Sequence, residues 1–192
     1  MCKLFTGLVF LLISFNVFAK SETYTLDPSH SYVMWRISHF GFSHPTGKWP
    51  ANGTLLLDQN APQKSKVNII IQLADLDTGN PELNKHLNSP LFFDASKYPT
   101  ATFVSNKIEL VGKNKAKVYG ILTVHGVSKP IILDTTLNKA AENPITNKPT
   151  VGFSATTHLN RSDYGLTSFL PGLSDNVDLS IEIEASKDVQ KK

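Results

Sequence analysis

Hydrophobic and polar residues alternate along most of the chain after residue 20, which is the pattern of strands with one buried face. The alternation is clearest near the C-terminus, where "VDLSIEIEA" places Val177, Leu179, Ile181 and Ile183 on one face. The other segments show the same period, or a short apolar run bounded by turn residues. The pattern therefore predicts strands at residues 31–40, 53–58, 66–76, 101–111, 116–124, 130–137, 150–159 and 177–185.

One segment departs from the two-residue period. The stretch "NPELNKHLNSPLFFD" offers Asn80 as a helix N-cap, Pro81 at the first helical position, and Leu83 and Leu87 four residues apart. Pro90 disfavours a helical conformation in the residue before it. We therefore predict a short helix that begins after Asn80 and ends before Pro90.

A sheet of antiparallel strands has two edges that must be covered, and closure into a barrel removes both. The pattern thus predicts an all-β fold, an extended antiparallel β-barrel of about eight strands with a short helix. A barrel of this size is either filled by side chains or holds one elongated ligand. Its inward set combines large residues, Trp35, Phe103 and Phe153, with small ones such as Gly120 and Ala155. We take this mixture to favour a cavity, and a filled core stays open as the alternative.

The first residues of the chain have the features of a secretory signal. They contain one lysine, then an apolar run, then small residues before Lys20. The run is short for a membrane-spanning helix, so we predict a cleaved signal peptide at residues 1–19 and not an integral membrane anchor. Residues 20–192 then form a single domain.

Removal of the signal peptide limits the chemistry that the mature chain can carry out. Cys2 is the only cysteine and leaves with the signal, so the mature chain has no disulfide and no thiolate chemistry. The formal charge of the whole chain is only +3 and its lysines are scattered, which argues against a nucleic-acid partner. An exported chain without disulfides points to the bacterial periplasm.

Five stretches carry a resemblance to a known family. They are "YTLDPSHSYVMWRISHFG", "HLNSPLFFDASKYPTATFVS", "VYGILTVHGVSKPIIL", "GFSATTHLNRSDYGL" and "LSDNVDLSIEIEA", in this order over residues 23–186. With them the chain resembles the YceI-like family of lipocalin-like periplasmic proteins. The resemblance implies an extended barrel with the helix near one mouth, and an elongated apolar cavity that binds a polyisoprenoid or similar amphiphilic lipid. It also implies a homodimer.

The helix departs from the family's pattern. The family often has an Arg–Asp pair where this chain has Leu83 and Asn84, an Arg at Asn88, and an acid at Leu91. The helix here therefore carries fewer charges than is usual for the family.

The six histidines and the acids of the chain form no recognisable catalytic or metal-binding motif. The sequence has no His-x-x-x-His helix, Cys-x-x-Cys pair or Gly-x-Ser-x-Gly elbow. We therefore predict no metal, no required cofactor and no enzyme activity. The alternative is an enzyme that modifies a lipid, with His39, Arg161 and Asp163 as its polar group.

Arg161 and Asp163 lie two residues apart in "NRSDYGL", so on an extended segment they point the same way. Two interpretations stay open for them. They form an ion pair that holds the loop, or Arg161 offers donors to a phosphate or quinone oxygen at the barrel mouth. His39 ends the inward face that contains Trp35, and it is either a packing residue or the polar end of the cavity.

The leading hypothesis is a periplasmic, non-enzymatic carrier or storage protein for an isoprenoid lipid, such as a quinone or a polyprenyl amphiphile. Binding of this kind needs many apolar walls, because each CH₂ group removed from water contributes about 0.8 kcal/mol. The predicted ligand contacts are Val33, Trp35, Ile37, His39, Val67, Ile69, Ile71, Leu87, Phe92, Phe93, Phe103, Leu122, Phe153, Arg161, Asp163, Leu179 and Ile181.

Overall fold

The computed structural model describes residues 21–188, and the predicted signal peptide lies outside this range. Within it, one antiparallel sheet runs in the order β1-β4-β5-β6-β7-β8-β9-β10-β2-β3, and β1 also pairs with β10. The strands are β1 (Glu22–Leu26), β2 (Tyr32–His39), β3 (Thr46–Pro50), β4 (Asn52–Leu57), β5 (Lys66–Gln72), β6 (Thr100–Leu110), β7 (Lys115–Val124), β8 (Val127–Glu142), β9 (Pro149–Asn160) and β10 (Leu173–Lys187).

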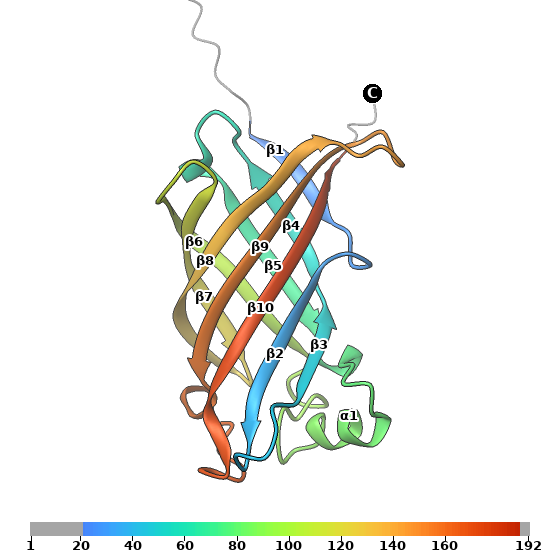
Figure 1. The fold of residues 1–192 in the computed structure, drawn as a ribbon, viewed down its shortest axis with the longest axis vertical. Coiled ribbons are helices and arrows are strands. Elements are labelled where there is room, and N and C mark those ends of the chain that lie inside the picture. Colours follow the sequence, from blue (N-terminus) through green and yellow to red (C-terminus); the bar gives the residue numbers. More distant parts are fainter. Residues whose placement is uncertain (1–20, 189–192) are drawn as a thin grey trace, which may run out of the picture.

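These strands close into an eight-stranded barrel, because two positions in the ring are each shared by two short strands. β1 and β2 both pair with β10, the first at Leu26↔Ala185 and the second at Trp35↔Leu179. β3 and β4 share the next position of the ring, where β4 pairs with β1 and β3 pairs with β2. The predicted all-β antiparallel barrel is confirmed (Figure 1).

Each predicted strand corresponds to an observed one, and the boundaries differ by a few residues except at β8 and β10, which are longer. The alternation does not predict β1 or β3. β3 contains Gly47 and Pro50, which are depleted in strands, and β1 is too short to show a period. β5 ends at Gln72 and not at residue 76 as predicted. It ends there because the chain then enters a 3₁₀-helix, η2 (Leu73–Asp75).

The predicted helix is α1 (Pro81–Leu87). The Asn80 side chain accepts hydrogen bonds from the backbone N–H groups of Glu82 and Leu83 at 3.0 and 3.3 Å, as an N-cap residue does. α1 lies beside one end of the barrel, the end where β2 finishes and β3 begins (Figure 1). The helix therefore stands at a barrel mouth, and its side chains are available to line it.

Strand register places the predicted apolar faces inside. Across β2 and β10, Val33 is opposite Ile181 and Trp35 opposite Leu179, so these four side chains share one face of the sheet. A bulge between Ser105 and Lys107 in β6 shifts the inward positions by one residue beyond it.

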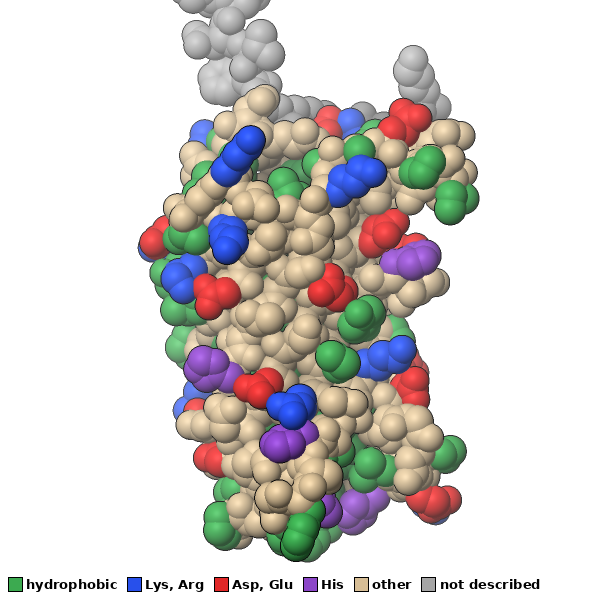
Figure 2. All heavy atoms as spheres, viewed as in Figure 1, with side chains coloured by type: hydrophobic (Ala, Val, Ile, Leu, Met, Phe, Trp, Pro, Cys, Tyr) green, Lys and Arg blue, Asp and Glu red, His purple; other side chains and the backbone are tan. Residues whose placement is uncertain are grey.

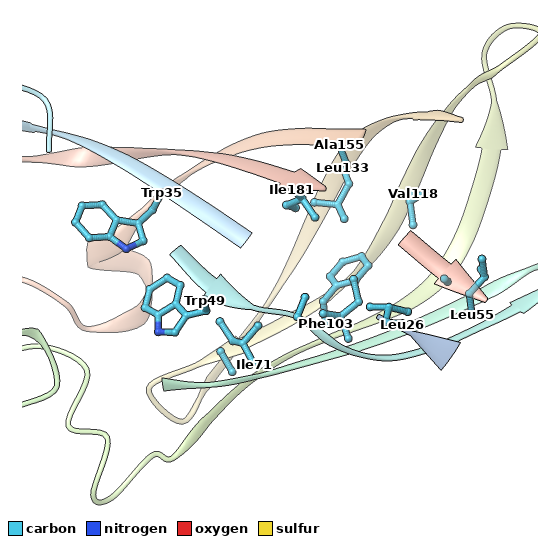
Figure 3. Packing of buried hydrophobic residues seen from close by; sticks show 14 of the residues in the cluster. Leu26, Trp35, Trp49, Leu55, Ile71, Phe103, Val118, Leu133, Ala155 and Ile181 are labelled. Carbon is cyan, nitrogen blue, oxygen red and sulfur yellow. The ribbon is translucent and has the colours of Figure 1, made fainter. Parts of the chain in front are cut away.

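The interior has two halves. In the half away from α1, side chains fill the barrel, and Tyr24, Leu26, Leu55, Val151 and Ala185 are almost completely buried. In the half beside α1, the interior is hollow. Figure 3 shows Leu26 and Leu55 at the filled end and Trp35 and Trp49 toward the hollow end.

Candidate functional site

The hollow half of the barrel is a cavity of about 580 Å³. Its walls come from β2, β3, β5, β6, β7, β8, β9 and β10, and α1 and three loops surround its open end. Nearly all lining side chains are aliphatic or aromatic, and the polar groups among them are few. Ligand sites of proteins commonly have this size and this mostly apolar lining.

Most of the predicted contact residues lie on this one surface. The cavity is lined by Val33, Trp35, Ile37, His39, Ile69, Ile71, Leu87, Phe92, Phe93, Phe103, Leu122, Arg161, Leu179 and Ile181, all from the predicted set. Period-two alternation could place those on strands because the strands are regular at these positions, whereas Leu87, Phe92, Phe93 and Arg161 lie on α1, the segment after it and η3. Their contact with a lipid remains a prediction.

Two predicted residues, Val67 and Phe153, point inward but lie outside the cavity. Both pack against the apolar core at the filled end. Alternation predicts which face of a strand is buried, but it carries no information on where along the barrel the interior stops being filled. On β5 the cavity lining ends at Ile69, which is the next inward residue to Val67.

The floor of the cavity is formed by Ile69, Phe103, Leu133 and Ile181, the deepest lining residues of their strands. The Phe103 ring lies against Gly120 on β7, where a Cβ atom would come within 2.4 Å of it. The mixture of large and small inward residues suggested open space at Gly120. Gly120 instead leaves no open space. It makes room for the aromatic ring that closes the cavity.

Asp163 does not line the cavity, because the segment Arg161–Tyr164 is not extended. It forms a 3₁₀-helix, η3, which ends at Gly165 with φ +76°. Residues three apart lie on the same side of a 3₁₀-helix, so Arg161 shares the cavity side with Tyr164, and Asp163 is exposed. The Arg161–Asp163 ion pair, one of the two interpretations of the sequence, is absent from the described residues.

Arg161 is 5% exposed and is held by backbone carbonyl groups. Its guanidinium donates to the carbonyl oxygens of Leu166, Ser168, Leu173 and Ser174. Burial lowers the pKa of the group below its ordinary value, although arginine stays protonated in proteins. The arginine thus joins the loop after η3 to the start of β10 and brings a positive charge to the cavity wall.

Asp175 is the acidic residue whose charge interacts with that of Arg161. Hydrogen bonds from the Ser162 hydroxyl (2.7 Å) and the Ser162 N–H (2.8 Å) lower the pKa of the Asp175 carboxyl, and the charge of Arg161 adds to the effect. The carboxylate therefore fixes η3 through Ser162 and does not form an ion pair with Arg161 among the described residues.

Tyr164 is a buried polar lining residue that the sequence pattern did not predict, in addition to apolar ones such as Trp49 and Leu133. It lines the cavity, is 2% exposed, and its hydroxyl has no hydrogen-bond partner among the described residues. Burial, with a contribution from Asp163, raises its pKa to about 12, so the phenol is protonated at neutral pH. The signal that could have found it is the i, i+3 spacing from Arg161, which becomes informative only if a 3₁₀-helix is assumed.

The Trp35 indole N–H is the second unpaired polar group on the cavity wall. Buried donors and acceptors are normally paired, and leaving one unpaired costs about 1–3 kcal/mol. Trp35 and Tyr164 both line the cavity, and their two unpaired polar atoms are buried in its wall.

His39 lies at the end of β2 and lines the cavity near its mouth. Its ring packs edge-on against Phe40, with 4.9 Å between the ring centroids. It makes no side-chain hydrogen bond to another described residue, and Asp163 does not approach the cavity with it. The lipid-modifying alternative that combined His39, Arg161 and Asp163 is therefore not assembled as predicted.

Between residues 21 and 188, no three His, Cys, Asp or Glu side chains are grouped so that they could bind a metal ion. Over the same range, none of the helices combines the length and the apolar character needed to cross a membrane.

The fold and the site define a class, the closed antiparallel β-barrels with an apolar internal cavity that opens beside a short helix. Within that class, residues 24–185 match the model of the YceI-like domain. The chain belongs to the YceI-like family.

Relatives support this assignment over nearly the whole chain. A UPF0312 protein of Pseudomonas savastanoi pv. phaseolicola is 39% identical over 180 residues, covering 91% of this chain and 90% of its own. The UPF0312 protein VVA0736 of Vibrio vulnificus is 34% identical over 185 residues and covers 95% of this chain and 96% of its own.

Solved structures show the same fold. The Campylobacter jejuni YCEI protein has a TM-score of 0.70 and 32% identity, covering 79% of this chain and 90% of its own. Burkholderia cenocepacia BcnA has a TM-score of 0.72 at 23% identity, with 83% and 98% covered. A polyisoprenoid binding domain from Saccharophagus degradans, implicated in plant cell wall breakdown, has a TM-score of 0.67 at 16% identity, with 86% and 98% covered.

Proposed function

We propose that the protein binds one isoprenoid lipid, a quinone or polyprenyl-type amphiphile, with the chain inside the barrel cavity. The observation that carries the proposal is the 580 Å³ cavity, which is lined almost entirely by apolar side chains and opens beside α1. The Saccharophagus degradans domain of similar fold, which is described as polyisoprenoid binding, supports the choice of ligand class. The protein would act as a carrier or store and release the lipid unchanged.

The polar groups of the wall supply the contacts for the lipid head. The Tyr164 hydroxyl and the Trp35 N–H are buried without partners, and Arg161 adds a positive charge. A quinone oxygen or a phosphate accepts hydrogen bonds from donors of these kinds. Because such groups are costly to leave unpaired, their presence on the wall favours a ligand with an oxygen-bearing head over a plain hydrocarbon.

Mass spectrometry of an organic extract tests the proposal. The protein is purified untagged from cells that export it, beside Ile131→Asn and Ile132→Asn variants. Ile131 lines the cavity, whereas Ile132 is its neighbour on β8 and is exposed on the outer surface. We expect a stoichiometric isoprenoid in the wild type and in Ile132→Asn, and a strongly reduced amount in Ile131→Asn.

Tryptophan fluorescence gives a second readout, because both tryptophans of the chain, Trp35 and Trp49, line the cavity. Addition of a quinone to protein freed of lipid should quench or shift their emission. An empty extract together with unchanged fluorescence would mean that the barrel binds no lipid of this class, and the proposal would be wrong.

We also propose that the protein works in the periplasm after loss of residues 1–19, and that it forms a homodimer. The expected mature chain begins at Lys20, which the intact mass of the exported protein tests directly. Sedimentation equilibrium tests the dimer. A mass that includes residues 1–19 would contradict the predicted cleavage.

A further inference from the structure

Three segments without charged residues meet at the open end of the cavity, and we call them the mouth rim. They are residues 37–47, 86–93 and 165–174, and none of them contains Asp, Glu, Lys or Arg. The charged residues that flank them along the chain are balanced, three basic and three acidic: Arg36, Lys48, Lys85, Asp94, Asp163 and Asp175. The rim therefore has no net charge of its own and none from its neighbours in sequence.

Contacts between the segments make the rim one surface. The Phe40 N–H donates to the Gly172 carbonyl oxygen at 2.7 Å, which joins the first segment to the third. The Ser168 hydroxyl donates to the Leu91 carbonyl oxygen at 2.6 Å, which joins the third to the second. The Phe92 and Phe169 rings stack with 6.0 Å between their centroids.

This uncharged surface exposes large apolar side chains. Phe42 is 91% exposed, and Phe40, Leu91 and Phe169 are each about half exposed. Figure 2 shows hydrophobic side chains at the lower tip of the molecule, the end at which α1 lies in Figure 1. Contiguous exposed apolar groups of this kind mark an interaction site.

The rim is continuous with the cavity. Phe40, Phe92 and Phe169 belong to the rim and also line the cavity. Phe40 and Phe169 have positive φ angles of 52° and 61°, a left-handed conformation that is uncommon for bulky side chains and costs free energy. The fold thus retains two strained aromatic residues at the point where the cavity meets solvent.

We propose that the mouth rim inserts into the surface of a lipid bilayer, so that an apolar ligand passes between membrane and cavity without entering water. The observations favour a bilayer over a protein partner because the rim offers no charge for a complementary surface, whereas exposed aromatic side chains bury readily at the boundary of headgroups and acyl chains. The balance of flanking charges means that binding does not depend on anionic lipid. The proposal goes beyond lipid binding and adds the place where exchange occurs.

Vesicle flotation tests this with vesicles of phosphatidylcholine, alone or mixed with phosphatidylglycerol. The variant is Phe42→Asp/Leu91→Asp, which changes two rim residues that do not line the cavity. The matched control is Ile145→Asp, since Ile145 is 89% exposed in the β8–β9 loop at the opposite end of the barrel. All proteins are purified after export in the same way and differ only at the substituted positions.

We expect the wild type and Ile145→Asp to float with both vesicle types to a similar extent. The double variant should bind vesicles about tenfold or more weakly, because two apolar side chains are lost from the contact. Thermal unfolding of the three proteins shows that they are folded. Flotation of the double variant equal to that of the wild type would overturn the proposal, as would binding that requires phosphatidylglycerol.

A second copy of the chain is the competing occupant of the rim. If the wild type does not float, and sedimentation shows a dimer that only the double variant loses, the rim is a self-association surface and the bilayer proposal is wrong. Lipid extraction is a separate readout from flotation. A double variant that keeps its extracted isoprenoid but no longer floats separates membrane docking from lipid binding.

Discussion

Arg161 and Tyr164 are two buried polar side chains on the cavity wall, and their hydrogen bonding differs. A filled barrel would need neither a buried guanidinium nor a buried hydroxyl without a partner. The guanidinium is compensated by carbonyl oxygens, including those of Ser174 and Leu173, at 2.9 and 3.0 Å. The Tyr164 hydroxyl is not compensated among the described residues.

Removal of that hydroxyl should therefore stabilise the lipid-free protein. For Tyr164→Phe we expect a gain in the free energy of unfolding of about 1 kcal/mol, because an unpaired buried polar group is removed at constant shape. The same change should weaken retention of a quinone by removing a hydrogen-bond donor. Chemical denaturation of lipid-free protein and quinone titration measure the two effects, and a loss of stability would show that the hydroxyl is paired in solution.

The raised pKa of Tyr164 predicts a dependence of stability on alkaline pH. Its pKa of about 12 in the folded protein lies above the value of 10.0 for an unperturbed tyrosine. Below pH 10 the phenol is protonated in both states, and between pH 10 and 12 only the unfolded chain releases the proton, so stability falls as pH rises. The difference between wild type and Tyr164→Phe isolates this contribution, and parallel curves for the two proteins above pH 10 would contradict it.

At the scale of elements, the short helices decide which side chains reach the mouth. η3 turns Tyr164 toward the cavity and Asp163 outward, and α1 contributes Leu83, His86 and Leu87 to the lining. α1 has only seven residues, too few to be stable alone, so its cap and its packing on the barrel hold it. Pairing between strands holds the barrel wall, whereas the mouth depends on these small elements.

The N-cap of α1 is therefore a sensitive point. Asn80→Ala should destabilise the helix by about 1 kcal/mol, since two N–H groups lose their acceptor. Hydrogen exchange of residues 81–87 should become faster, while exchange in β6 to β9 stays unchanged. Asn80→Asp keeps a capping oxygen and should restore protection, and equal exchange in all three proteins would mean that packing alone holds the helix.

At the scale of the whole molecule, the barrel is filled at one end and hollow at the other, and Phe103 stands at the boundary. The ring packs on Gly120 and, with Leu133 and Ile181, closes the cavity. The position of this floor sets the longest chain that can lie in the cavity without disturbing the filled half.

Phe103→Ala should move the floor and lengthen the cavity. We expect a loss of about 3–5 kcal/mol in the free energy of unfolding, as for other buried Phe→Ala changes, and a shift of the bound isoprenoids toward longer chains. Phe153→Ala is the matched control, because Phe153 packs in the filled half and does not line the cavity. Mass spectrometry of the extracts compares chain lengths, and the same distribution in both variants would show that Phe103 does not limit length.

Much of this structure can be predicted from local patterns. The period of two along Val33, Trp35 and Ile37 correctly gives the inward face of β2, and the Asn80–Pro81 pair correctly begins α1. The same rule fails at Asp163, because a strand period was applied to a 3₁₀-helix. It also cannot separate Val67 from Ile69, which have the same chemistry and face but lie on opposite sides of the cavity floor.

The sequence by itself determined the strand faces, the helix start and the absence of charge along residues 37–47, 86–93 and 165–174, because each depends on residues close together in the chain. Only the tertiary structure decided that these three segments meet at one mouth, that Phe103 closes the cavity over Gly120, and that Arg161 is bound by carbonyl groups instead of Asp163. The physical reason is that closure of the barrel, not local preference, brings distant strands and loops together. Where side chains fill the interior and where they leave it open follows from that closure.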